Sequence, residues 1–214
     1  MGQALELEPR ISPGGQEIAY CSQESGSSDI WITDIRGGQP IRMTTGPSHE
    51  TSPTWFPNGS SVAFVSDRSG KPSIWMAPRF GGSPVMIIAD GVDPSVSPDG
   101  KLIAFSRAAE DGFRRIAVAS IASPEAARVL TTRDNGLWDH RHPSWSPDGS
   151  TICYQDQRDL WVVGLKGKRA RCLTRDDAVD TDPACSPNGR FIYFCSSRGG
   201  PQAIWRVETD GGYV

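Results

Sequence analysis

The sequence lacks the features that mark several large classes of protein. No run reaches the length of about 18 apolar residues that a membrane span needs, so no membrane insertion is expected. The segment from Met1 to Arg10 has neither the basic start nor the apolar centre of a signal peptide. The formal net charge is only −3, which excludes a domain-wide basic field for nucleic acid or an anionic membrane.

The sequence also lacks motifs for metal binding and for several kinds of catalysis. Its five cysteines include no CxxC pair, and an odd number cannot all pair within one chain, so we expect free thiols and a reducing compartment. Walker, dinucleotide-fingerprint and zinc-finger patterns are absent, and so is the G-x-S-x-G motif of α/β-hydrolases. These absences make an enzyme the less favoured hypothesis.

Glycine and proline are plentiful, with 23 and 17 residues, and they recur in a fixed pattern. Five segments share Pro, then Gly, Asn or Asp, then Gly, which is the chemistry of a tight β-turn. The prolines of these segments are spaced 44, 41, 49 and 40 residues apart: Pro13, Pro57, Pro98, Pro147 and Pro187. A repeat of about 43 residues matches one four-stranded propeller blade.

Each turn leads into a strand with the same residue types on one face. A β-branched residue is followed two positions later by an aromatic one, as in Ile103 and Phe105, so this face is expected in the core. A second strand some ten residues on carries a tryptophan in four of the five repeats: Trp31, Trp75, Trp161 and Trp205. We expect an all-β fold, one domain over residues 1–214, with antiparallel four-stranded repeats at about 8–46, 47–90, 91–132, 139–176 and 180–214.

Segments such as HPSWSPDGSTICY, RDLWVVG and RCLTR resemble the PD40, or TolB-like, β-propeller repeat over residues 8–212. Because such propellers usually have six or more blades, the resemblance implies either a closed five-bladed ring or part of a larger propeller, and we favour the part. In a closed ring, residues 2–7 would complete the last blade by pairing near Ala203–Val207. Otherwise an edge is open to pairing with another chain or with a missing domain.

Strand parity places the variable loops on one face and the Pro-x-Gly and Gly-Gly turns on the other, which we expect to be structural. The variable loops contain all three histidines, beside several acids. The candidate binding residues are therefore Trp138, Asp139, His140, His142, His49, Glu50 and Asp180. Imidazole with carboxylate suits a transition metal or acid–base chemistry, which makes His49, His140 and His142 candidate ligands of a divalent metal, with no other cofactor expected.

Other residues of these loops have structural explanations that compete with a site. Asp93 and Asp182 precede prolines and are expected to cap turns. Arg68, Arg158 and Arg198 recur after the second strand, and this periodicity favours hydrogen bonding between blades over contacts with an anion or a partner.

The favoured function is non-enzymatic binding of a protein or peptide. The resemblance implies this mode, since the propeller that gives the family its name contacts an outer-membrane lipoprotein. The alternatives are a metal-dependent oligogalacturonate-type lyase, or the substrate-gating propeller of a prolyl-oligopeptidase-type peptidase without its hydrolase domain. The resemblance suggests the periplasm, whereas the thiols and the absent leader suggest the cytoplasm.

Overall fold

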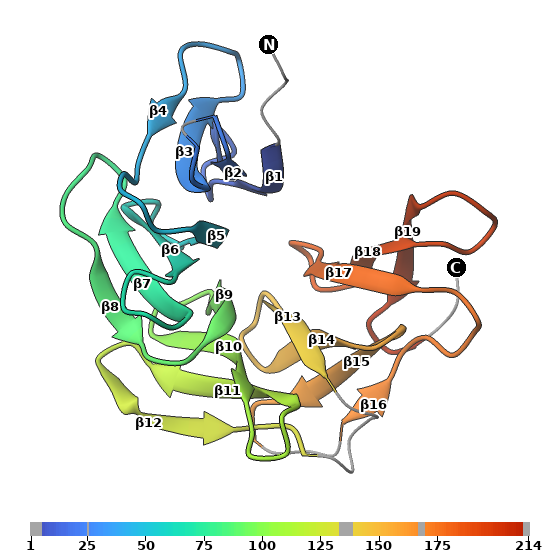
Figure 1. Cartoon of the computed structure of the whole chain (residues 1–214). Coiled ribbons are helices and arrows are strands. Elements are labelled where there is room, and N and C mark those ends of the chain that lie inside the picture. Colours follow the sequence, from blue (N-terminus) through green and yellow to red (C-terminus); the bar gives the residue numbers. More distant parts are fainter. Residues whose placement is uncertain (1–5, 25, 133–138, 167–169, 212–214) are drawn as a thin grey trace. The chain divides into compact units, whose positions relative to one another are not determined.

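The computed structural model describes residues 6–24, 26–132, 139–166 and 170–211, and all the regular elements in these ranges are β-strands (Figure 1). None of these residues belongs to a helix that could span a membrane. The chain divides into two compact units, Met1–Val96 and Ser97–Val214. The expected all-β fold of five antiparallel repeats is confirmed.

The first unit contains two four-stranded sheets and the strand β9 (Val92–Val96). The first sheet has the order β1 (Glu6–Ile11), β2 (Glu17–Ser22), β3 (Asp29–Asp34) and β4 (Ile41–Arg42). The second sheet has the order β5 (Glu50–Trp55), β6 (Ser61–Ser66), β7 (Ser73–Pro78) and β8 (Val85–Ile88). In both, strands that follow each other in the sequence pair side by side.

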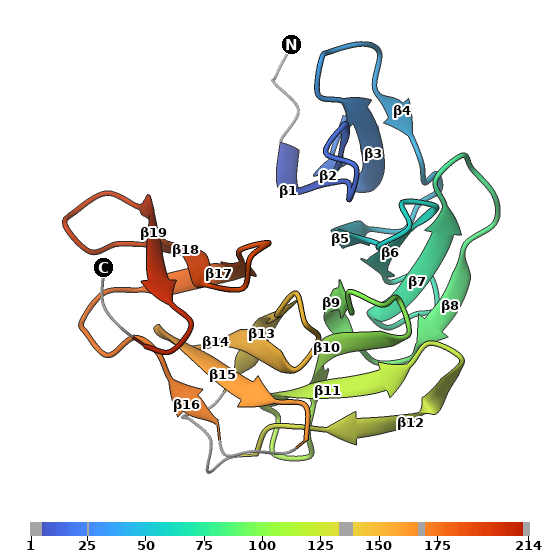
Figure 2. The ribbon, with the colours of Figure 1, turned by 180° about the vertical axis from the view of Figure 1, so that it is seen from behind.

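The second unit contains the remaining strands, which Figure 2 shows from behind. The third sheet has the order β12-β11-β10-β9, with β10 (Leu102–Ala108), β11 (Arg114–Ser120) and β12 (Ser123–Val129). The fourth sheet consists of β13 (His140–Trp145), β14 (Thr151–Asp156), β15 (Asp159–Gly164) and β16 (Arg171–Cys172). The fifth has three strands within the described residues: β17 (Asp180–Cys185), β18 (Phe191–Ser196) and β19 (Ala203–Glu208).

The Pro-x-Gly segments form the turns that the sequence predicts. In the fifth sheet the amide of Gly189 donates to the carbonyl of Ser186 over 2.9 Å. Gly189 has a φ of 69°, a conformation that glycine adopts at little cost. The side-chain Oδ1 of Asn188 accepts the amide of Arg190 over 3.0 Å, which closes the turn. These turns set the register of the two strands that they join.

Within each unit, the core lies between successive sheets, where one face of a sheet packs on the opposite face of the next. Between the fourth and fifth sheets, Cys153, Leu160 and Leu173 pack with Ile192 and Phe194. The β-branched and aromatic positions on the first strand after each turn are therefore core positions, as the sequence predicts. The tryptophans pack beside them and are half-buried: Trp75, Trp161 and Trp205.

Two further expectations concern the closing segment, residues 2–7, and the five cysteines. Glu6 and Leu7 pair with Ser22 and Cys21 of β2, so these two residues already belong to the first sheet and are not a spare segment for the last one. Residues 2–5 of the proposed closing segment lie outside the described residues. All five cysteines are free thiols.

Candidate functional site

The first residue of the opening strand carries a buried carboxylate in two sheets. In the second sheet, Glu50 Oε1 accepts hydrogen bonds from Arg68 Nη2 over 3.0 Å and from the hydroxyl of Ser66 over 2.8 Å. In the fifth sheet, Asp180 Oδ2 accepts one from Arg198 Nη2 over 2.6 Å. Each arginine thus pairs with an acid of its own sheet, whereas the sequence predicted hydrogen bonding between blades. Arg198 also pairs with Asp176, in the loop between the fourth and fifth sheets, over 3.2 Å.

The arginines are held in place by aromatic rings of their own sheet. The guanidinium carbon of Arg198 lies 5.1 Å from the ring centre of Phe194 and 5.4 Å from that of Trp205. Arg68 lies in the same way over Phe64 and Trp75, at 5.6 and 5.1 Å. A cation in contact with an aromatic face is stabilised by the ring quadrupole, so each pair is part of the packed core.

The fourth sheet replaces this ion pair with a buried histidine network. His140 stands where the other sheets have Glu50 and Asp180, and its imidazole is fully buried. Its Nδ1 lies 2.7 Å from the hydroxyl oxygen of Thr131, which also accepts the amide of Ile116 over 2.9 Å. The hydroxyl proton is therefore available to Nδ1, an arrangement that favours the tautomer with its proton on Nε2.

Two neighbours define the other side of this imidazole. Its Nε2 lies 3.9 Å from a carboxylate oxygen of Asp156, and its ring meets the Tyr154 ring edge-on with centres 5.0 Å apart. Arg158, although it shares the repeat position of Arg68 and Arg198, is exposed. In this sheet the buried acid is Asp156, the last residue of β14, and not the first residue of β13. The paired position on β13 holds the neutral His140.

Glu50, His140 and Asp180 are therefore not accessible to a partner, contrary to their expected position in a binding surface. Each is fully buried although it begins the strand that follows a loop. Loop position in the sequence predicted exposure, but strand pairing decides which way the side chain points. These three residues stabilise the loops and do not contact solvent.

Burial lowers the pKa of His140 because it penalises the charged imidazolium. The charge of Asp156 opposes this effect, that of Arg115 adds to it, and that of Asp139 opposes it. The unfolded state, with an ordinary histidine pKa of about 6.5, then binds the proton more tightly than the folded state. The stability contributed by neutral His140 is present above about pH 6.5 and is lost as the pH falls toward the lower pKa of the folded state.

We expect His140→Gln to reduce the loss of stability between about pH 7 and pH 5, because glutamine does not titrate in this range. The measurement is the free energy of unfolding in urea at several pH values, compared as a slope with that of the wild type. The variant is expected to be less stable at pH 7, since the contact with Thr131 changes. Equal slopes for the two proteins would contradict a buried titrating imidazole.

A second recurrent position lies near the start of the opening strand, directly before a proline. In all five sheets this residue has a left-handed backbone conformation, with φ between 48° and 54°: Glu8, Ser52, Asp93, His142 and Asp182. We call these residues the bulge row, because the strand register shifts around this position in four sheets, as between Thr181 and Ala184. A left-handed non-glycine residue is strained by about 1 kcal/mol or more, so its recurrence in every sheet indicates a built feature.

The bulge row also corrects the expectation that Asp93 and Asp182 cap turns. They stand within the strands β9 and β17, in the left-handed conformation, and not in turns. In the second unit, His142 Nδ1 lies 3.2 Å from Asp182 Oδ1, and both side chains are partly exposed. In the first unit, the Glu8 carboxylate accepts the amide of Ser52. Bulge-row residues of the first and second sheets, and of the fourth and fifth sheets, thus contact each other.

The remaining predicted residues have separate partners. The amide of His49 donates to Asp67 Oδ1 over 2.9 Å, and its ring lies 3.5 Å from the amide of Ser28. Partial burial of Asp139 acts to raise its pKa, but the hydrogen bond from Arg141, at 2.6 Å, is among the contacts that hold that pKa below its usual value. Trp138 lies outside the described residues.

The histidines do not converge within the part of the chain that the structure describes. His140 bonds to Thr131 whereas His142 faces Asp182, although the two stand on one strand. Among the described residues, no group of three or more His, Cys, Asp or Glu side chains is placed to hold a metal ion. In the second unit the accessible part of the candidate site is the pair His142 and Asp182, which follow Arg141 and Thr181 on their strands, and in the first unit His49 is exposed.

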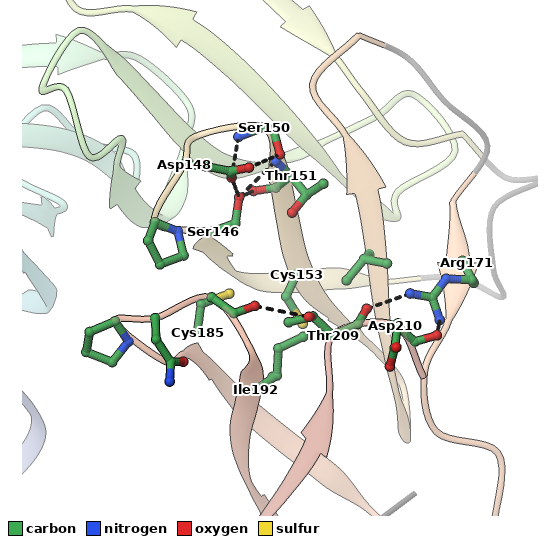
Figure 3. Close-up of a pocket in the computed structure, with 15 residues that line it drawn as sticks. Ser146, Asp148, Ser150, Thr151, Cys153, Arg171, Cys185, Ile192, Thr209 and Asp210 are labelled. Atoms are coloured by element: carbon green, nitrogen blue, oxygen red, sulfur yellow. Dashed lines mark hydrogen bonds between the residues drawn. The ribbon is translucent and has the colours of Figure 1, made fainter. Parts of the chain in front are cut away.

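A groove of about 490 Å³ lies on the turn side, which the sequence had assigned to structure alone (Figure 3). The buried Cys153 and Ile192 and the more exposed Ser146 and Asp148 are among the residues that line it. Asp148 is already bonded to the Ser146 hydroxyl, at 2.6 Å, and that bond contributes most to lowering its pKa. Pairs of Pro-x-Gly turns one repeat apart were the available sequence signal for this groove.

The repeat matches the model of a known protein family. The PD40 family model, described as the TolB β-propeller domain, matches residues 3–160 and 141–214. The chain belongs to the TolB β-propeller family. A TolB structure from Acinetobacter baumannii superposes with a TM-score of 0.82 at 22% identity, covering 97% of this chain and 53% of that one. A TolB-type structure from Agrobacterium tumefaciens gives 0.85 at 23% identity, covering 98% and 79%, and the predicted β-propeller fold is confirmed.

The curated relatives of this TolB-family chain are considerably longer than the chain. It is 35% identical over 126 residues to the uncharacterized protein Atu1656 of Agrobacterium fabrum, which covers 57% of the chain and 41% of that protein. It is 28% identical over 122 residues to the Tol-Pal system protein TolB of Bordetella pertussis, covering 56% of the chain and 28% of that protein. The chain therefore spans less than half of the length of these relatives.

Enzymes share the fold at lower similarity. An oligogalacturonate lyase in complex with manganese superposes with a TM-score of 0.65 at 14% identity, covering 94% of this chain and 61% of that one. At this identity the likeness shows the fold alone, because one repeat fold hosts many activities.

Proposed function

We propose that this chain is a non-enzymatic propeller module that binds another protein through the exposed part of its bulge row. The observation that carries the proposal is the partly exposed His142–Asp182 pair, held on the bulged opening strands of the fourth and fifth sheets. The family resemblance supports this mode, since TolB-like propellers interact with other proteins. The same pair is available to a peptide segment, which would present the same hydrogen-bonding groups.

The bulges offer a partner backbone hydrogen-bonding groups as well as side chains. Where the register shifts between Arg141 and Ser144, and between Thr181 and Ala184, an extra residue leaves the β-ladder. Backbone groups that leave a ladder can bond to an incoming segment. Arg141 adds a guanidinium to this surface, held by Asp139 at 2.6 Å. A partner that presents both donors and acceptors would fit this mixture of charges.

The other candidate residues, His140, Glu50 and Asp180, have partners inside the protein, and this favours binding over catalysis. A general base must reach a substrate proton, and the buried His140 is surrounded by Thr131, Tyr154 and Asp156. The two buried carboxylates are bonded to arginines. These groups perform structural work, which leaves recognition to the exposed pair.

The test is binding to the outer-membrane lipoprotein that TolB proteins contact, prepared without its lipid anchor and titrated calorimetrically. We expect His142→Ala and Asp182→Ala each to weaken binding about 5- to 30-fold, an effect typical of losing a partly buried polar contact of about 1–2 kcal/mol. Arg190→Ala serves as the matched control, since Arg190 is an exposed member of a Pro-Asn-Gly turn segment and pairs with Glu208.

Two outcomes would overturn this proposal. One is the absence of binding by the folded wild type. The other is binding that the variants His142→Ala and Asp182→Ala leave unchanged.

A further inference from the structure

A repeat position that holds tryptophan in two other sheets holds a small residue beside the groove of Figure 3. This position is the last residue of the opening strand, and in the second and fourth sheets it is a buried tryptophan, 7% exposed in each case: Trp55 and Trp145. In the fifth sheet the same register position holds Cys185. Cys185 lines the groove of about 490 Å³ between the fourth and fifth sheets.

The residue that faces this position also differs at the groove. Trp55 shares a core cluster with Ala19 of the first sheet. Trp145 shares one with Ala104 of the third sheet. The equivalent of these alanines in the fourth sheet is Cys153, which also lines the groove. A tryptophan against an alanine is thus replaced by two cysteines, which fill less of the interface than an indole ring does.

A backbone carbonyl marks where the indole N–H lies in the filled interface. Trp55 donates from Nε1 to the carbonyl oxygen of Arg10 over 2.9 Å. Arg10 pairs across the strands with the alanine of the first sheet, and Ser144 pairs with Cys153 in the same register. The equivalent carbonyl of Ser144 is contacted by Cys185 Sγ at 3.9 Å. Because a thiol is a weak donor and a carbonyl has two lone pairs, this oxygen can accept a stronger donor.

A second pair of residues also leaves the groove open. Between the first and second sheets, Arg79 Nη2 and Glu17 Oε1 form an ion pair at 2.5 Å, in the corresponding place between the turns. The equivalent residues between the fourth and fifth sheets are Thr209 and Thr151, both of which line the groove. Their side chains are shorter than those of arginine and glutamate, so they do not bridge it.

The less exposed residues of the groove are uncharged at pH 7. Burial raises the pKa of the Cys185 thiol to about 11, and burial also holds the pKa of Cys153 well above its ordinary value. Val162 and Ile192 add aliphatic groups to the same lining. Sulfur atoms make favourable contacts with aromatic rings, so this lining suits a neutral aromatic ligand.

The exposed residues of the groove favour a small molecule over a peptide. Arg171 donates to the carbonyl oxygens of Thr209 and Asp210, at 2.6 and 2.9 Å, so its guanidinium is engaged within the protein. Pro147 and Pro187 have no amide hydrogen to offer a peptide backbone. A free ring needs only the space and the carbonyl acceptor.

We propose that this groove binds a small, neutral aromatic molecule with an N–H donor, of the indole class. The ring would lie where Trp55 and Trp145 lie between other sheets, in contact with Cys153 and Cys185. Its N–H would donate to the carbonyl oxygen of Ser144. A volume of about 490 Å³ is within the range of small-molecule sites. This inference is independent of the binding role of the bulge row.

The experiment is a calorimetric titration of the protein with indole. We expect one site with a Kd of about 0.1–1 mM, the range for a ligand of so few atoms. Cys185→Trp restores the residue of the other sheets and should abolish binding, because the new side chain occupies the site. Cys185→Ala is the matched control: it leaves the groove open and should bind indole within about 3-fold of the wild type. Cooperative urea unfolding of both variants verifies that they are folded.

Two further ligands test the donor and the source of the ring on the wild type. 1-Methylindole keeps the ring without its N–H and should bind about 5- to 10-fold more weakly, the effect of losing one hydrogen bond. N-Acetyl-tryptophanamide presents the ring on a peptide backbone and should bind at least about 10-fold more weakly than indole. Tighter binding of N-acetyl-tryptophanamide than of indole would overturn the assignment to a small molecule, in favour of a tryptophan of a partner protein.

Alkylation of the wild type locates the ligand without any variant. At about pH 9, indole at five times its Kd should slow the reaction of Cys185 with iodoacetamide about 6-fold, as measured by mass spectrometry of the peptides. Cys195 is also half-buried but does not line the groove, so its rate should not change. The proposal is overturned if the wild type does not bind indole, if Cys185→Trp binds it as the wild type does, or if indole leaves the alkylation of Cys185 unchanged.

Discussion

Replacing Arg198 with alanine is expected to lower the free energy of unfolding by about 3–5 kcal/mol, the usual effect of leaving a buried charge unpaired. Asp180 is fully buried, and among the described side chains it accepts a hydrogen bond from Arg198 alone. The substitution also removes the guanidinium from the rings of Phe194 and Trp205. Chemical denaturation in urea, followed by tryptophan fluorescence, measures the change.

Arg158→Ala is the matched control because Arg158 occupies the same repeat position but is exposed. Its effect should stay within about 0.5 kcal/mol, as for most surface substitutions. Adding Asp180→Asn to Arg198→Ala should restore part of the lost stability, since the unpaired charge is then gone. Similar losses for Arg158→Ala and Arg198→Ala would show that the buried ion pair is not the cause.

Replacing Phe105 with alanine is expected to destabilise the protein by about 3–5 kcal/mol, the range for removing a fully buried aromatic ring. Phe105 stands in the middle of β10 and is 0% exposed. Truncation removes its contacts and leaves a cavity that the rigid neighbouring strands cannot fill. The same urea titration measures the loss, with the slope of the unfolding curve compared to detect changes in cooperativity.

Phe80→Ala provides the comparison for this second prediction. Phe80 is 88% exposed, with Arg79 4.6 Å from its ring centre, so little packing is lost. A change of less than about 0.5 kcal/mol is expected. If Phe105→Ala lowered the free energy of unfolding as little as Phe80→Ala, the aromatic position would not be part of the core that the repeat pattern predicts.

The repeat architecture was predictable because its signals are local and recur five times. A turn such as Pro187 to Gly189 needs a residue that tolerates positive φ, and the glycine supplies it within three positions. The alternation that buries Ile192 and Phe194 is likewise a property of one strand. Five copies of each signal reinforced one another, so strand positions and core faces followed from the sequence.

The candidate site was less predictable because its residues are paired across strands. The segments SDR, DQR and SSR look alike, yet Arg68 and Arg198 neutralise buried acids while Arg158 faces solvent. The difference depends on whether the opposing strand begins with an acid or with His140. Likewise, a residue before proline gives no sign that it will adopt a left-handed bulge, since the bulge arises from the register with the next strand.

The sequence by itself determined the all-β repeat, its turns and the side chains that form each core face, because a period of two along a strand and the φ of a turn are short-range properties. Tertiary structure alone decided which equivalent residues are covered. Leu160 and Ile204 occupy the same repeat position, but Leu160 packs with Ile192 and Phe194 of the fifth sheet whereas Ile204 is exposed. It also decided that His140 is enclosed whereas His142 meets Asp182 at the surface, since both outcomes require strands that are distant in the sequence.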